Sequence, residues 1–425
     1  MSDLMQVLAE DTPLKPVAPA SKQGMGFLLG ILVGCIICVP VFVTGAQMAQ
    51  QYDYSTFIWG TLLGGVLVAA VSILTGHVGV RTGLSSSMLA KMAFGSRGYV
   101  LVNIALALSS IGWFGIQTTV FSSSFVSLSQ QVWGYTPSLA LVTLVAGAVM
   151  SSTAVIGFRG VGKLSYIASP LLLILILLPL YQFWQSGQLV GVTGHVSQEG
   201  AGLLTLVAII SGAAFSYAAS APDYTRLMRT SGGMAIATLG GLAVFYPFLL
   251  IVTGLVSLAA NNGDFMQIML NLGFGSLAIV VLFLATWTTN DVNAYGGALA
   301  ANLFLPSVPR WKLTVLVGAV GTVASLLGIF EHFITWLIFI GNVFAPMAGA
   351  YVADYWLNPT RYDVKKEIPT MRPNPLAAWL AGLAVGLATT APANMGAGLF
   401  TLSGISSLDA LVVAAAVLWG LKRFD

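Results

Sequence analysis

Long apolar stretches recur along this chain and are separated by short polar segments. A helix needs about 20 apolar residues to cross the hydrocarbon core of a bilayer. Windows of that kind fall near residues 25–46, 57–80, 99–129, 137–157, 163–184, 201–221, 233–259, 275–304, 312–329, 332–353, 374–392 and 405–421. The pattern predicts twelve membrane-spanning helices, spans 1 to 12, in one transmembrane domain at 24–425 that follows a polar tail at 1–23.

The basic residues give these spans an orientation. All 17 Lys and Arg residues fall in the tail, in the loops that follow even-numbered spans, or at the C-terminal end. Loops that carry an excess of Lys and Arg stay in the cytoplasm. We therefore predict that both ends of the chain are cytoplasmic. The net charge of +3 is explained by this topology and indicates no nucleic-acid partner.

Composition supports a lipid environment. Hydrophobic residues make up 57% of the chain and charged residues only 7%, whereas soluble domains carry about 25% charged residues. Span 1 contains Gly34 and Pro40, and span 6 contains Gly212 and ends at Pro222. Interrupted helices at corresponding positions of two halves point to a transporter binding site. Ordinary proline kinks are the alternative interpretation.

Span 8 contains the densest run of polar side chains. Polar groups within a membrane span are costly and usually functional. Thr288 and Thr289 offer hydroxyl oxygens that suit a sodium ion, and Asn290, Asp291 and Asn293 follow them. Asp291 is the strongest single candidate, because a buried carboxylate could bind substrate or carry a coupling proton. The alternative is that it belongs to a structural hydrogen-bond network.

Span 3 carries a second cluster, in which Trp113 and Gln117 are four residues apart and share a helix face. An indole stacks on a flat heterocycle, and a carboxamide can donate to and accept from its edge. Gly112 and Gly115 would let a substrate approach the backbone, and Ser110 lies one turn before Trp113. Simple packing of these side chains remains the alternative.

Span 6 adds the cluster Phe215, Ser216 and Tyr217 just before its break, with simple packing as the alternative. Two acidic residues near cytoplasmic ends, Asp223 and Asp354, are expected to form local ion pairs with Arg226 and Arg361. The chain has no phosphate-binding glycine loop, no metal-ligand spacing and no nucleophile elbow. A membrane enzyme or a substrate sensor is therefore the less favoured class, and an ion gradient is the expected energy source.

Three stretches of the chain resemble the nucleobase–cation symporter-1 family, which includes cytosine permeases and hydantoin transporters. They are RTGLSSSMLA at 81–90 followed by AFG at 93–95, GWFGIQ at 112–117, and WTTND at 287–291. The resemblance implies an all-α integral membrane protein with twelve transmembrane helices in a LeuT-like fold. Its five-plus-five inverted repeat would comprise spans 1–5 (25–184) and spans 6–10 (201–353), followed by two C-terminal helices (374–421).

The resemblance also implies a substrate site between spans 1, 3, 6 and 8, with Trp113 as stacking platform. The expected substrate-binding residues are Trp113, Gln117, Ser110, Phe215, Ser216, Asn290, Asp291 and Asn293. A sodium ion would lie between spans 1 and 8. Its expected ligands are the carbonyl oxygens of Val39, Phe42 and Ala285 and the hydroxyls of Thr288 and Thr289.

The function implied by the resemblance is import of cytosine or a related nucleobase across the bacterial inner membrane, coupled to Na⁺ or H⁺. Alternating access around a fixed midplane site would move the substrate. Cytosine permeases have Gln where this chain has Ser110, while the hydantoin and purine branches share Gln117. Hydantoin, purine and hydroxymethylpyrimidine substrates therefore stay open. The expected partners are the small-molecule substrate and the lipid bilayer, and the protein is expected to act as a monomer.

Overall fold

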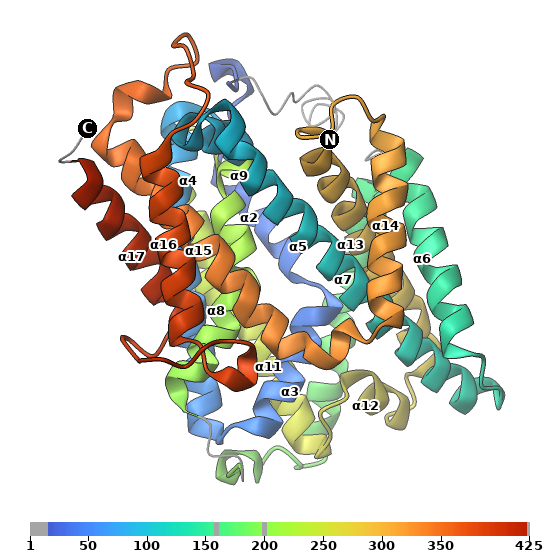
Figure 1. Cartoon of the computed structure of the whole chain (residues 1–425). Coiled ribbons are helices and arrows are strands. Elements are labelled where there is room, and N and C mark those ends of the chain that lie inside the picture. Colours follow the sequence, from blue (N-terminus) through green and yellow to red (C-terminus); the bar gives the residue numbers. More distant parts are fainter. Residues whose placement is uncertain (1–15, 157–160, 198–201, 423–425) are drawn as a thin grey trace.

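The protein is a stack of helices that run side by side (Figure 1). The computed structural model describes residues 16–156, 161–197 and 202–422, and these contain no strand beyond one isolated bridge between Gln23 and Met228. Most of the predicted tail lies outside the described residues, as do Lys15, Arg159 and Arg423 of the basic segments.

The main helices follow one another with short connections. They are α2 (Met25–Ile36), α3 (Val39–Gln51), α4 (Tyr54–Thr82), α5 (Ser86–Trp133), α6 (Leu139–Ile156), α7 (Val161–Gln185), α8 (Leu203–Ser220), α10 (Ser231–Thr238), the π-helix η3 (Leu239–Phe245), α11 (Tyr246–Ala260), α13 (Gly275–Asn302), α14 (Arg310–Leu326), α15 (Phe333–Leu357), α16 (Pro373–Thr389) and α17 (Ser406–Leu421). Shorter helices are α9 (Pro222–Thr225), α12 (Phe265–Asn271), and the single turns η4 (Ile329–His332) and η6 (Pro392–Asn394).

Each of the twelve predicted windows coincides with one helix or with consecutive helices among the described residues. By length and apolar character alone, six helices in this part of the chain could cross a membrane, and the bent pair α2–α3 would be a seventh. Shorter apolar stretches lie in α6, α7 and α17. A membrane accommodates a short apolar helix by local thinning, so these lengths agree with a multi-pass membrane protein.

The predicted break in span 1 is confirmed, whereas span 6 is less interrupted than predicted. α2 and α3 meet at an angle of 63°, and Cys38 between them is extended, with φ −144° and ψ 155°. Pro40 stands in the first turn of α3, where its missing N–H leaves no helical bond unmade. By contrast, α8 runs unbroken through Gly212 to Ser220. A Cβ at Gly212 would lie 2.5 Å from the Leu337 carbonyl oxygen, so this glycine serves close packing against α15.

Helix α5 begins far earlier than the predicted span 3 and is kinked at Gly95, where φ is +88° and ψ 170°. The kink frees backbone groups that would otherwise pair along the helix. The connection between α15 and α16 supplies partners for them. Three backbone hydrogen bonds join the two segments: Ser96 N–H to Pro369 O (2.9 Å), Arg97 N–H to Thr370 O (2.8 Å) and Arg372 N–H to Phe94 O (3.0 Å).

A buried carboxylate holds that connection in place. Asp354 at the end of α15 pairs with Arg361 at 2.9 Å, which confirms the predicted local ion pair, and lies 3.8 Å from Arg372. The Tyr362 hydroxyl donates to its other oxygen at 2.8 Å. Because all three partners belong to the connection, Asp354 fixes the segment that docks at the α5 kink.

The spans form two packed groups. In the first group α4 packs against α8 and against α10–α11, which in turn pack against α2–α3; α5, α6, α13 and α14 form the second group. Helices α16 and α17 pack on α15 along the side of the molecule opposite α6 and α14, whereas α15 packs against α8 and runs across the molecule toward the end of α14 (Figure 1). Few contacts join α5 to α3 or α8, so the seam between the groups is the place for an internal cavity.

Small residues lock α6 to α14 inside the second group. A Cβ at Gly147 would lie 2.0 Å from the Thr322 hydroxyl, and one at Gly318 would lie 1.9 Å from the Ser151 hydroxyl. Each hydroxyl donates along its own helix, Thr322 to Gly318 O and Ser151 to Gly147 O. The reciprocal glycine–hydroxyl pairs let the two backbones approach closely, as small residues do in membrane proteins.

Candidate functional site

A cavity of about 290 Å³ lies in the seam between the two groups of helices. Its wall is formed by residues of α2, α3, α5, α8 and α13, with contributions from α9 and α11. The lining extends from Trp113 to Ser87 and Leu303, which lie near the basic loops. The volume is near the lower end of the roughly 300–1,000 Å³ typical of ligand pockets, which suits a small ligand.

The break between α2 and α3 forms one wall of the cavity. Cys35, Cys38 and Pro40 all line it, together with Thr44. The Thr44 hydroxyl donates to the Pro40 carbonyl at 2.8 Å, so this polar group is satisfied within its own helix. The predicted sodium ligands Val39 and Phe42 belong to the same helix but are buried away from the cavity lining.

Helix α5 forms the opposite wall and presents the predicted cluster. Ser110, Trp113 and Gln117 line the cavity at intervals of one turn. Gln117 is only 1% exposed, and its Oε1 has no hydrogen-bond partner in the described part of the chain. The Trp113 ring is half-buried and meets Phe333 edge-on, with centroids 6.4 Å apart at 76°. An unpaired acceptor therefore lies one turn from an aromatic face.

The glycines beside Trp113 serve packing and do not open the backbone to a ligand, contrary to the prediction. A Cβ at Gly112 would lie 2.2 Å from Cζ2 of Trp336, and one at Gly115 would lie 2.8 Å from the Gly321 carbonyl. Both glycines thus face α14 and α15. Because they are one and two residues from Trp113, helix geometry turns them away from the cavity.

Helix α13 brings only part of its polar run to the cavity. Thr289 and Asn293 line it, whereas Asn290 and Asp291 do not. Asn290 is fully buried and donates through Nδ2 to Phe114 O (3.2 Å) and Thr118 Oγ1 (3.1 Å). Its Oδ1 accepts from Asn293 Nδ2 at 3.2 Å. Asn290 therefore orients Asn293 and supports the cavity from behind.

Asp291 points to α6, away from the cavity. Its carboxylate accepts a hydrogen bond of 2.5 Å from the Thr153 hydroxyl, and the same hydroxyl oxygen accepts one of 2.7 Å from Trp287 Nε1. Asp291 is 4% exposed. This network corresponds to the structural alternative considered for Asp291, because it connects α13 to α6 within one packed group.

The two threonines predicted to bind sodium converge on one carbonyl. Thr288 Oγ1 and Thr289 Oγ1 lie 3.1 and 2.8 Å from the Ala285 oxygen. Each hydroxyl oxygen keeps its lone pairs after the O–H donates to that carbonyl. Three oxygens of α13 are thus close together, although only Thr289 of the three residues lines the cavity, and such oxygen ligands suit a hard cation.

Helix α8 contributes a different aromatic side chain from the one predicted. Ser216 and Tyr217 line the cavity, while Phe215 does not. Phe215 is fully buried toward α15, where a Cβ at Gly341 would lie 3.7 Å from its ring. Tyr246 of α11 also lines the cavity and donates to Ile210 O at 3.1 Å. Tyr217 belongs to the polar cluster predicted in span 6, but Phe215 was the aromatic residue expected at the substrate.

A contact between the two groups lies at the end of the cavity near the basic loops. Asp223 of α9 lines the cavity and accepts from both the backbone N–H of Ser86, at 2.9 Å, and its hydroxyl. Arg226, the predicted local partner, donates through Nε to the Asp223 carbonyl at 3.4 Å. The carboxylate therefore ties the first turn of α5 to the end of span 6.

Comparison with known proteins identifies the family of this chain. Residues 23–406 match the family of permeases for cytosine/purines, uracil, thiamine and allantoin. The cytosine permease of Escherichia coli (strain K12) is 27% identical over 384 residues, which are 88% of this chain and 87% of that protein. The hydantoin permease of Microbacterium maritypicum is 24% identical over 366 residues, covering 81% and 73%.

A solved structure confirms the fold class. It is a nucleobase-cation-symport-1 family transporter in a closed conformation with bromovinylhydantoin bound, with a TM-score of 0.77 at 20% identity, covering 97% of this chain and 95% of that one. The predicted LeuT-like helical arrangement is therefore correct. Because the family match spans most of the chain, this protein belongs to the nucleobase–cation symporter-1 family of permeases.

Proposed function

We propose that this protein is a cation-coupled symporter that carries cytosine or a related uncharged, planar heterocycle. The observation that carries the proposal is the wall of the seam cavity, where Trp113 and Gln117 lie one turn apart. A buried acceptor without a partner costs free energy, so the Gln117 oxygen favours a ligand that brings an N–H donor. The indole face favours a flat ring.

The shape and charge of the cavity favour a neutral ligand. Its polar lining consists of hydroxyl and carboxamide groups such as those of Ser110, Ser216 and Asn293, and among the described residues that line it only Asp223, at one end, is charged. Nucleobases and hydantoins are largely uncharged near neutral pH and present N–H and carbonyl groups on one edge. Hydantoin, purine and hydroxymethylpyrimidine substrates remain alternatives to cytosine, since each has this combination.

The coupling ion in this proposal is Na⁺, with H⁺ as the alternative. The hydroxyls of Thr288 and Thr289 and the carbonyl of Ala285 would hold it, with the carbonyls of Val39 and Phe42 completing the shell from α3. A bound cation adds positive charge to the transported complex, and each charge moved through 100 mV is worth about 2.3 kcal/mol. Thr289 also lines the cavity, so the cation and the substrate would share one helix face.

Asp291 and Asn290 have supporting positions in this proposal. Asn290 orients Asn293 at the cavity wall, and Asp291 fixes α13 against α6 through Thr153. Phe215 supports α8 from its buried side. We further propose that the protein acts as a monomer in the inner membrane with both ends in the cytoplasm, and that it catalyses no chemical reaction.

A thermal-shift panel on the purified protein tests the proposal. The panel contains cytosine, adenine, hydantoin and hydroxymethylpyrimidine, each with and without sodium. We expect at least one compound to raise the melting temperature, because a ligand that binds only the folded state stabilises it. Sodium should increase the shift if sodium is the coupling ion.

A pair of tryptophan variants makes the panel specific to the cavity. Trp113→Ala should abolish the shift, whereas Trp133→Ala, an exposed position at the other end of α5, should retain it. A shift that survives Trp113→Ala would remove the stacking role of Trp113. A panel in which no compound stabilises the wild-type protein would contradict the proposed substrate class.

A further inference from the structure

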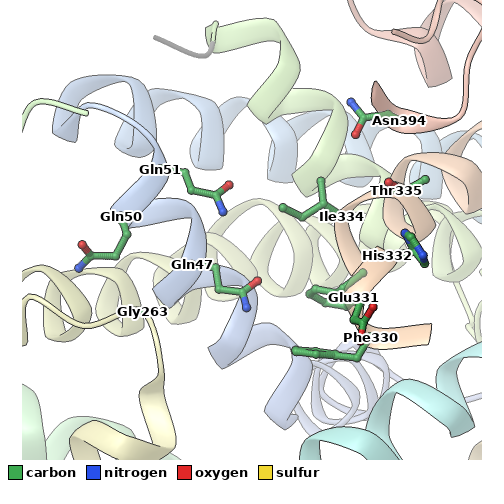
Figure 2. A pocket seen from close by; sticks show the side chains of 11 residues that line it. Gln47, Gln50, Gln51, Gly263, Phe330, Glu331, His332, Ile334, Thr335 and Asn394 are labelled. Carbon is green, nitrogen blue, oxygen red and sulfur yellow. The ribbon is translucent and has the colours of Figure 1, made fainter. Parts of the chain in front are cut away.

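A second, larger hollow lies at the opposite end of the molecule from the basic loops. It has a volume of about 630 Å³ and is lined by the outer end of α3, by residues 330–335 of η4 and α15, and by Gly263 and Asn394. We call it the outer bowl (Figure 2). It is separate from the seam cavity, although a substrate that enters from that side would pass through it.

Free carboxamides form the polar part of the outer bowl. The side chains of Gln47, Gln51 and Asn394 make no hydrogen bond with any described residue. Figure 2 shows Gln47 and Gln51 extending from α3 toward the segment of η4 and α15, whereas Gln50 points away from it. Gln50 is accounted for, because its Nε2 donates to Ser257 O (2.9 Å) and Oγ (3.1 Å). Two glutamines therefore present donors and acceptors with no partner of their own.

An aromatic surface stands beside these amides. The rings of Phe330 and Phe333 are stacked, with centroids 5.4 Å apart at 22°, and both residues line the bowl. Phe333 in turn meets Trp113 edge-on. Phe333 of the outer bowl thus contacts Trp113 of the seam cavity, and it lies between the two cavities.

The charges around the outer bowl select among ligands. Among the described residues that line it, Glu331 is the one carboxylate, His332 beside it is the one basic side chain, and there is no Lys or Arg. A carboxylate repels anions, whereas its effect on a neutral molecule is small. Aromatic faces, free carboxamides and this charge are together suited to an uncharged planar heterocycle with N–H and carbonyl groups, and unsuited to an acid.

We infer that the outer bowl is a second binding site for the transported heterocycle, at which it is held by Gln47 and Gln51 before it passes Phe333. This inference rests on the proposed function, because it assigns the same ligand class to both sites. The site is weaker than the seam cavity, since it is open to solvent and its carboxamides are only half-buried.

Equilibrium binding and uptake with radiolabelled cytosine, adenine and hydantoin test the inference. We expect the wild-type protein to bind two molecules of at least one of these probes, the second at least tenfold more weakly. Trp113→Ala should lose the tight site and keep the weak one. The double variant Gln47→Leu, Gln51→Leu should lose the weak site, keep the tight one, and raise KM for uptake several-fold at unchanged maximal rate.

Two further variants guard against indirect effects. Gln267→Leu on nearby α12, which lies outside the bowl and bonds to Asn271, should leave the stoichiometry and KM unchanged. Phe330→Ala should weaken the second site independently of the glutamines if the double variant folds poorly. A wild-type stoichiometry of one, dependent on Trp113, would overturn the inference and leave the proposed function intact. Absence of binding by all three probes would overturn both.

Discussion

Replacing Gln117 with leucine should weaken substrate binding and leave the fold unharmed. The side chain is 1% exposed, and its Oε1 has no partner in the described part of the chain. Leucine has a similar volume and no polar atom, so the free protein loses an unsatisfied acceptor and gains apolar contact. Its melting temperature should therefore stay the same or rise slightly.

The bound state behaves differently. If a substrate N–H donates to Gln117, the leucine variant leaves that N–H buried and unpaired, at a cost of about 1–3 kcal/mol. Since 1.4 kcal/mol corresponds to a factor of ten, the dissociation constant should rise about 5- to 140-fold. The loss should be smaller for a substrate analogue that lacks the donor, because that analogue has nothing to leave unpaired.

Equilibrium binding of radiolabelled substrate to purified protein, with and without the donor group on the ligand, measures this coupling as a double-mutant cycle. Gln130→Leu, an exposed position on the same helix, is the matched control and should bind like the wild type. If Gln117→Leu binds within twofold of the wild type while Trp113→Ala does not bind, the carboxamide makes no contact with the substrate and the reasoning fails.

Three further changes probe the proposed cation site, the packing of α6 against α14, and the contact of Asp223 with Ser86. Thr289→Val should raise the sodium concentration needed for half-maximal binding about tenfold or more, since a ligand oxygen is lost; Thr286→Val, whose hydroxyl only bonds within the helix, should not. Gly318→Ala should lower stability by about 1–3 kcal/mol through overpacking, measured by thermal unfolding, and Ser151→Gly in the same protein should recover most of the loss. Asp223→Ala should speed alkylation of the cysteines that line the cavity, followed by mass spectrometry; an unchanged rate would show that the carboxylate does not restrain that end.

The number and order of the helices could be predicted from the sequence because the energy of crossing a bilayer depends on each segment by itself. An apolar window lowers the free energy of insertion whatever its neighbours are, and basic loops are retained on one side for similarly local reasons. The break in span 1 is also local, since Pro40 cannot continue a helix that precedes it. These features required no knowledge of packing.

The rotation of each helix about its own axis could not be predicted in the same way. Span 8 is polar on several faces, so hydropathy does not say whether Thr289 or Asp291 turns to the cavity. The contacts decide it: Thr153 on α6 engages Asp291, which leaves Thr289 and Asn293 for the cavity. The same holds for α8, where hydropathy does not show that Phe215 packs toward α15 and Tyr217 faces the cavity.

The docking of residues 369–372 at the Gly95 kink couples the position of the last two helices, α16 and α17, to that of α5. These helices lie outside the repeated core. The connecting segment that leads into them is bonded to the kink that orients the first turns of α5, where Ser86 donates to Asp223. A displacement of the C-terminal region would reach the end of the cavity near the basic loops through the three backbone hydrogen bonds at the kink. Variation in the C-terminal helices could thus change how fast the transporter turns over without altering a single residue that touches its cargo.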